Sequence, residues 1–220
     1  RSSEPKWIDR DRFILSKGHA GVGVYAVLAE CGFFNVIELN KHYQDGSIFS
    51  GHVSHKGIPG VELSTGSLGH GLPVSAGMAL AAKIDKKDHK IFVVMSDGEL
   101  DEGSNWEAFM FASHHGLSNL TAIIDRNKLQ SMKTTEETLS LEPLRDKLIA
   151  FGWNVIEVDG HNHDELFLAI DSYTKKPKVI IANTIKGKGV SYMENEIAWH
   201  YRTPNGELFD QAMKDLGEKT

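Results

Sequence analysis

The stretch from Ile91 to Gly103 reads IFVVMSDGELDEG, in which five consecutive apolar residues run directly into an acidic, glycine-containing segment. An unbroken apolar run of this length is typical of a strand that is buried on both faces of a parallel sheet. The next residues, Ser96 to Gly103, form the turn that leads toward a helix. The stretch therefore predicts a central strand whose carboxyl end carries acidic side chains.

Outward from this strand, short apolar runs alternate with helical patterns. Further strands are expected at Leu120–Ile124, Trp153–Val158 and Val179–Ala182. Helices are expected at Ala20–Glu30 with Ser16 as its cap and Gly32 as its stop, from Asn35 toward Tyr43 with Asn35 and Glu38 as a capping box, and at Gly69–Lys83, Trp106–His115, Leu144–Phe151 and Glu165–Tyr173. This order predicts an α/β fold, a parallel sheet with helices on both faces, in which ligands bind beyond the carboxyl ends of the strands. No repeat or linker divides the chain, so one domain spanning 1–220 is expected.

Composition excludes several classes of function. The chain has 220 residues, 40% of them hydrophobic, and a formal net charge of -6, so the basic surface of a nucleic-acid-binding protein is missing. Basic residues are dispersed, and no apolar run approaches the ~18 residues of a membrane span. Cys31 is the single cysteine, which excludes an internal disulfide and a cysteine-based zinc site and fits the cytoplasm.

Asp97 and Asn127 follow two neighbouring predicted strands and lie 30 residues apart. A right-handed crossover of that size brings the two strand ends close together. Their side-chain oxygens and a nearby backbone carbonyl form the hard oxygen shell that Mg²⁺ prefers when phosphate oxygens and water complete it. Gly98 would allow a diphosphate to approach closely. The alternative for the Asp-Gly pair alone is an ordinary strand-to-helix turn.

The combined pattern is more specific than the pair. It consists of Asp97-Gly98-Glu99, Glu102-Gly103, Trp106-Glu107-Ala108, Asn119-Leu120 and Asp125-Arg126-Asn127-Lys128-Leu129-Gln130. In order and spacing it resembles the thiamine-diphosphate signature of transketolases, although Ser96 stands where that family usually has glycine. The resemblance implies a thiamine-diphosphate-binding fold and a Mg²⁺ ion (or Ca²⁺ or Mn²⁺) bound by Asp97, Asn127 and the Leu129 carbonyl. It also assigns Gly98, Glu99, Glu102 and Asn127 to the cofactor site.

The same resemblance selects histidines. The segment Arg10–His19 is similar to the transketolase segment whose histidine contacts the cofactor diphosphate, which implies that role for His19. The spacing from His52 to Glu62 implies that His52 is a catalytic residue facing substrate hydroxyls. His200, in Trp199-His200-Tyr201, matches a catalytic histidine that supports proton transfer and contacts the diphosphate.

One loop and several other histidines complete the set. Gly66, Ser67 and Leu68 match the family loop that lies against the cofactor, or simply begin the following helix; His70 replaces the usual glutamine and takes no role. His42, His89, His114 and His115 are interpreted as surface or packing residues. His52 with His55, and His161 with His163, lack the further partners that a zinc site needs.

Thiamine diphosphate supplies the carbon chemistry itself. In transketolases a second domain, across a subunit interface, provides the glutamate that contacts the aminopyrimidine ring. The chain resembles the N-terminal third of a full-length transketolase, and its Pro204–Glu207 segment matches the version divided into two subunits. A separate C-terminal subunit with the pyrimidine domain is therefore expected, in a heterotetramer. A histidine-bearing Gly-His-Pro-Gly-like segment is absent before Arg10 and the chain begins with Arg1, so an upstream helical segment is expected to be missing.

The resulting hypothesis is transfer of a two-carbon ketol unit between sugars or sugar phosphates. One alternative is a subunit of another thiamine-dependent enzyme, a 2-oxo acid dehydrogenase or decarboxylase, although those enzymes lack the 15–19 and 51–62 patterns. Another is a non-catalytic assembly partner, against which the intact Asp97, Asn127, His19 and His52 count. The donor sugar, the acceptor sugar and the pathway are not determined by the sequence.

Overall fold

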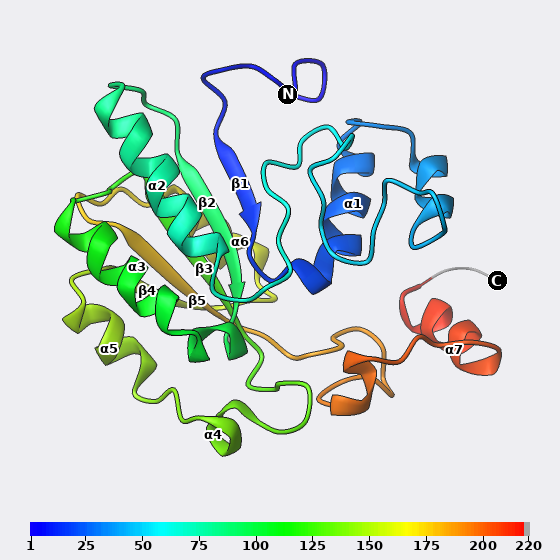
Figure 1. Cartoon of the computed structure of the whole chain (residues 1–220). Helices are drawn as coiled ribbons and strands as arrows, with labels where there is room; N and C mark the ends of the chain where they lie inside the picture. Colours follow the sequence, from blue (N-terminus) through cyan, green and yellow to red (C-terminus); the bar gives the residue numbers. More distant parts are fainter. Residues whose placement is uncertain (218–220) are drawn as a thin grey trace.

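The computed structural model describes residues 1–217, and its centre is a five-stranded sheet in which every neighbouring pair is parallel (Figure 1). The strands are β1 (Arg12–Leu15), β2 (Ile91–Ser96), β3 (Leu120–Arg126), β4 (Asn154–Asp159) and β5 (Lys178–Asn183). Their order across the sheet is β1-β2-β3-β5-β4. Residue 91 thus begins an inner strand, as its unbroken apolar run predicts.

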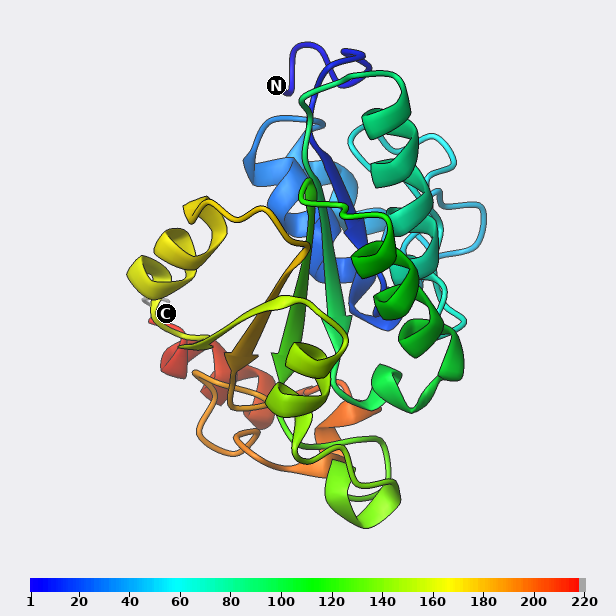
Figure 2. The same cartoon turned by 90° about the vertical axis from the view of Figure 1, so that its left-hand side faces the viewer.

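Helices cover both faces of the sheet, which confirms the predicted fold class. The α-helices are α1 (Gly21–Glu30), α2 (Gly71–Ile84), α3 (Gly103–His114), α4 (Thr135–Thr138), α5 (Leu144–Ala150), α6 (His163–Asp171) and α7 (Glu207–Asp215). Short 3-10 helices span Gly18–Ala20, Val36–Lys41, Gly98–Asp101 and Ile197–His200. Figure 2 shows α2 and α3 on one side of the sheet and α6 on the other.

The strand order explains which helix lies on which face. From β1 to β4 the chain progresses in one direction across the sheet, and α2, α3 and α5 lie in these connections. From β4 to β5 it turns back. Because strand crossovers are right-handed, the reversal places α6 on the opposite face from α2, α3 and α5.

Alternating side chains of β2 contribute to cores on both faces. Ile91, Val93 and Met95 are fully buried in the cluster that α2, α3 and α5 share with the sheet. Val94 packs on the other face, in the cluster formed with α1. A third cluster joins α6 to β4 and β5. An inner strand packed from both sides is rigid, and it leads directly into Asp97.

Some sequence expectations were wrong. β1 was not predicted, and Ser16 does not cap a helix: it follows β1, and Ala20 is the N-cap of α1. Asn35 does cap the following turn by accepting the Ile37 N–H, but that turn is a 3-10 helix ending at Lys41 and lacks the predicted capping box. A capping box instead occurs at Thr134 and Glu137. The run at 153–158 forms an edge strand that is only partly buried.

A helix that crosses a bilayer needs a long, predominantly apolar sequence. Among residues 1–217, no helix has both the length and the apolar character for this.

Candidate cofactor site

The carboxyl ends of β2 and β3 bring the two predicted metal-binding segments together. Ser96 pairs with Asp125 in the sheet, and the Asp97 N–H donates to the Asp125 carbonyl at 3.2 Å. The parallel register thus carries Asp97 alongside the loop that contains Asn127 and Leu129. All three predicted metal-binding residues line one cleft of about 580 Å³.

Asp97 is almost completely buried, at 1% exposure. Its Oδ1 accepts the Gly98 N–H at 2.8 Å, and its Oδ2 accepts the Lys128 N–H at 2.6 Å and the buried Arg126 guanidinium at 3.2 Å. Burial raises the pKa of Asp97 above its usual value, although these donors act in the opposite direction. A carboxylate has about four acceptor positions, so one remains for a cation.

The Asn127 loop offers oxygens of the same kind. The Leu129 N–H donates to Asn127 Oδ1 at 3.0 Å, while Lys128 between them adopts a left-handed φ of 65°. Within this turn no hydrogen bond is donated to the Leu129 carbonyl, and Asn127 Oδ1 keeps its second lone pair. One carboxylate, one amide oxygen and one carbonyl fit Mg²⁺, which usually retains water or phosphate ligands. No group of three His, Cys, Asp or Glu side chains suited to a metal occurs within the described residues.

Three predicted histidines line the same cleft, although their sequence positions are far apart. His19 follows β1, His52 lies in the loop between α1 and α2, and His200 ends a 3-10 helix after β5. The ring centroids of His19 and His200 are 5.5 Å apart. A Cβ added to Gly66 would lie 3.2 Å from the His52 ring, so glycine allows the 64–68 loop to contact this histidine.

The other predicted cofactor residues divide into two groups. Gly66, Leu68 and Gly98 line the cleft. Ser67 and Glu102 are exposed and do not line it, and Glu99 is fully buried behind it. Burial raises the pKa of Glu99, even though hydrogen bonds from Ser16 and Gly69 favour its charged form.

Sequence reasoning missed two cationic residues of the cleft, Lys17 and Lys186. Lys17 pairs with Asp125 at 2.6 Å, and this ion pair holds the pKa of Asp125 below its ordinary value against the effect of burial. Lys186 is partly buried, which lowers its pKa, and nearby Lys17 lowers it further. Lys17 belongs to the quoted Arg10–His19 segment, whereas Lys186 carries no comparable local signal. Together with the histidines these lysines make the cleft suitable for an anion.

The lowered pKa of His19 predicts how the folding stability of the ligand-free protein depends on pH. Burial, followed by the positive charges of Lys17 and His200, lowers its pKa to about 4. In the unfolded chain His19 has an ordinary pKa of about 6.5 and binds the proton first, so folding stability is lost as the pH falls from about 6.5 to 4. We expect His19→Asn to reduce this loss by about 1 kcal/mol, a value discounted because His19 is exposed to solvent that screens its charge. Urea unfolding at several pH values tests this, with His163→Asn as the control; equal pH slopes in both variants and the wild type would contradict it.

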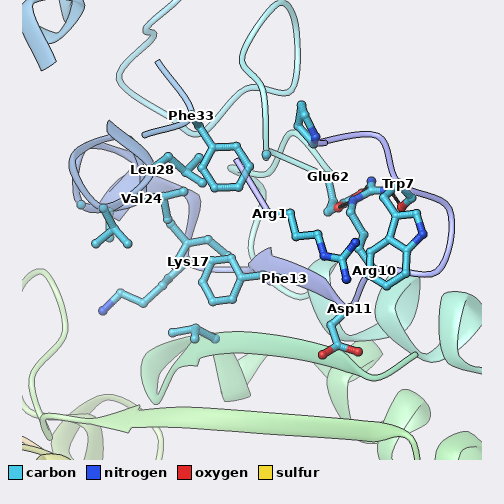
Figure 3. Close-up of a pocket in the computed structure, with 17 residues that line it drawn as sticks. Arg1, Trp7, Arg10, Asp11, Phe13, Lys17, Val24, Leu28, Phe33 and Glu62 are labelled. Carbon is cyan, nitrogen blue, oxygen red and sulfur yellow. Dashed lines mark hydrogen bonds and ion pairs between the residues drawn. The ribbon is translucent and has the colours of Figure 1, made fainter. Parts of the chain in front are cut away.

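A second cavity, of about 740 Å³, lies beyond β1 and differs in character (Figure 3). Its wall is apolar, with Phe13, Val24, Leu28 and Phe33 turned toward one another, and Arg10 and Glu62 form an ion pair of 2.8 Å at one end. It contains none of the predicted metal-binding residues or histidines. We therefore place the candidate site in the polar cleft.

Comparison with known proteins adds independent information. Residues 1–218 match the family model described as transketolase, thiamine diphosphate binding domain. A subunit of apulose-4-phosphate transketolase from Phocaeicola vulgatus is 47% identical over 219 residues, covering 98% of this chain and 78% of that protein. A subunit of 6-deoxy-6-sulfo-D-fructose transketolase from a Clostridium species is 42% identical, covering 96% of this chain and 78% of that protein.

A solved structure agrees with the fold. The transketolase from Campylobacter jejuni superposes with a TM-score of 0.91 at 30% sequence identity, covering 99% of this chain. The chain spans 36% of the length of that enzyme. These relatives are named as transketolases or transketolase subunits. Their names favour the transketolase hypothesis over a subunit of a 2-oxo acid dehydrogenase or decarboxylase.

Proposed function

Because the chain belongs to the transketolase family, as a thiamine diphosphate binding domain, we propose that the polar cleft holds the diphosphate of this cofactor through Mg²⁺. When bound, thiamine diphosphate supplies the carbanion chemistry of two-carbon ketol transfer. The reaction class is that of a thiamine-diphosphate-dependent transketolase. The single observation that supports the site is the convergence of Asp97, Asn127, Leu129 and the three predicted histidines, His19, His52 and His200, on one cleft.

Different residues of the cleft would bind the metal, the diphosphate and the substrate. Asp97, Asn127 and the Leu129 carbonyl would hold the metal, with Arg126 and the Lys128 N–H fixing the Asp97 carboxylate. His19 and His200, 5.5 Å apart, would face the diphosphate; burial lowers the pKa of both rings, which favours their neutral form in the ligand-free cleft. His52 would contact substrate hydroxyls.

The test is a calorimetric titration of thiamine diphosphate into the chain with Mg²⁺, without and then with its candidate pyrimidine-domain subunit. We expect binding that requires the metal and tightens when the partner is present, because the partner would complete the site. Replacing Mg²⁺ by excess chelator should abolish the heat of binding. No binding in any of these conditions would exclude the cofactor assignment.

The assembly and the compartment are also part of the proposal. Relatives that are named as single subunits of a transketolase support a partner chain, and we propose a heterotetramer of two such pairs. The names of the relatives mention apulose-4-phosphate and 6-deoxy-6-sulfo-D-fructose, which support sugar phosphates or modified sugars as the substrate class. The exposed, free Cys31 fits a reducing cytoplasm.

Substitution of Lys186, which lines the cleft, tests whether the diphosphate binds there. Its partly buried ammonium has a lowered pKa because burial disfavours the charge, and a diphosphate in the cleft would neutralise it. Charge-assisted hydrogen bonds contribute about 1.5–3 kcal/mol, so Lys186→Met should weaken cofactor binding about 10- to 100-fold and reduce its salt dependence. Lys188→Met is the matched control, because Lys188 pairs with Glu194 outside the cleft. Equal losses in both variants would contradict a direct role for Lys186.

A further inference from the structure

Behind the candidate cleft lies a carboxylate that no part of the proposed chemistry uses. Glu99 has 0% exposure, yet its carboxylate accepts three hydrogen bonds. Its Oε1 accepts the Gly69 N–H at 3.0 Å and the hydroxyl of Ser16, and its Oε2 accepts the Ser96 N–H at 3.3 Å. A buried carboxylate is costly unless such donors surround it, so its retention here requires a reason.

Ser16 connects the Glu99 carboxylate to a second backbone amide, that of Gly71. Its hydroxyl donates to Glu99 and accepts the Gly71 N–H at 3.1 Å. A Cβ on Gly71 would lie 2.3 Å from the Ser16 side chain, so the chain approaches Ser16 as closely as only glycine permits. One carboxylate therefore fixes the amides of both Gly69 and Gly71.

The other end of this loop is fixed separately. The Thr65 hydroxyl donates to the carbonyl of Leu15, the last residue of β1. Gly18 packs against the Thr65 carbonyl so closely that a Cβ there would lie 2.3 Å away. Between the two anchors lies the segment 66–68, of which Gly66 and Leu68 line the cleft. The segment is thus a short span held at both ends over the cleft.

We propose that Glu99 is a positioning residue. From behind the cleft, it holds the 66–68 segment in the position in which that segment contacts thiamine diphosphate. This inference rests on the proposed function and changes the role of Glu99, which acts on the loop rather than on the cofactor. Since Glu99 lies only two residues after Asp97 on the same turn, it links the loop to the strand end that carries the metal-binding carboxylate. The loop and the metal site therefore keep a fixed separation.

The matched substitution is Glu99→Gln, which keeps the shape but replaces one acceptor oxygen by a donor facing the Gly69 or Ser96 N–H. Glu30→Gln, at an exposed position at the end of α1, is the control. Cofactor affinity is measured by calorimetry with Mg²⁺ and the candidate partner subunit, and amide exchange is measured by mass spectrometry on peptides that cover 64–72 and, separately, β3 and β5. We expect about 10-fold weaker cofactor binding, as for loss of an outer-shell group, and faster exchange confined to 64–72.

A purely structural role would accelerate exchange in β3 and β5 as well, and that result would overturn the inference. Unchanged cofactor affinity in Glu99→Gln, with normal binding by the wild type, would also overturn it while leaving the proposed function intact. Absence of cofactor binding in the wild type would overturn both. Ser16→Ala provides a second variant: because it acts through the same carboxylate, its effect on affinity should not add to that of Glu99→Gln.

Discussion

Replacing Asp97 by alanine is expected to weaken metal-dependent binding of thiamine diphosphate by more than about 100-fold, since loss of outer-shell partners alone costs about 10- to 100-fold. Asp97 is the one carboxylate among the residues that line the cleft in the described part of the chain. Without it, the Asn127 and Leu129 oxygens remain as neutral ligands for a divalent ion. Calorimetric titration at several Mg²⁺ concentrations measures the effect.

The fold should survive this change. Arg126 would lose one partner but keep Glu136 and Glu142, each at 2.9 Å. Asp97→Asn is the more conservative variant and should lose less affinity, because its amide oxygen can still reach the ion. Asp88→Ala, which removes an exposed carboxylate outside the cleft, should leave binding as in the wild type. Undiminished binding of thiamine diphosphate by Asp97→Ala would contradict the proposed metal site.

The predictable part of this molecule is the part that is local in sequence. Asp97 and Asn127 each follow a strongly apolar strand, and parallel strands in sequence order place their ends side by side. The strand-end position of both residues therefore followed from two short apolar runs. The prediction that Gly66 belongs to the cofactor site came instead from the resemblance of its loop to a transketolase loop.

The missed features depend on contacts that are distant in sequence. β1 is four residues long and has the partly exposed Phe13, so it has too little apolar pattern to be recognised. Ser16 resembled a helix cap because its true partner, Glu99, lies 83 residues away. Lys186 reaches the cleft only because the segment after β5 passes the carboxyl ends of the strands, as the orange trace in Figure 1 shows. Such contacts are determined by how loops cross the sheet, and no local pattern encodes that path.

The chain alone is expected to transfer ketol units at a rate at least about 100-fold below that of its complex with the pyrimidine-domain subunit. The cofactor needs a carboxylate at its aminopyrimidine ring, and general acid-base groups contribute about 10²–10⁴ to a rate. Asp97 is not available for this role, because the Lys128 N–H, the Gly98 N–H and Arg126 hold its carboxylate at the position proposed for the metal. No glutamate lines the cleft in the described part of the chain.

The assay titrates the candidate partner into a fixed concentration of this chain, with a ketose phosphate donor, a short aldose acceptor, thiamine diphosphate and Mg²⁺. Activity should rise to saturation at one partner per chain. An Asp97→Ala chain should assemble equally well by gel filtration but remain inactive, which separates a catalytic half-site from a non-catalytic assembly partner. Full transfer by this chain alone would show that the missing carboxylate comes from its own residues, and the division of the site between two subunits would then be wrong.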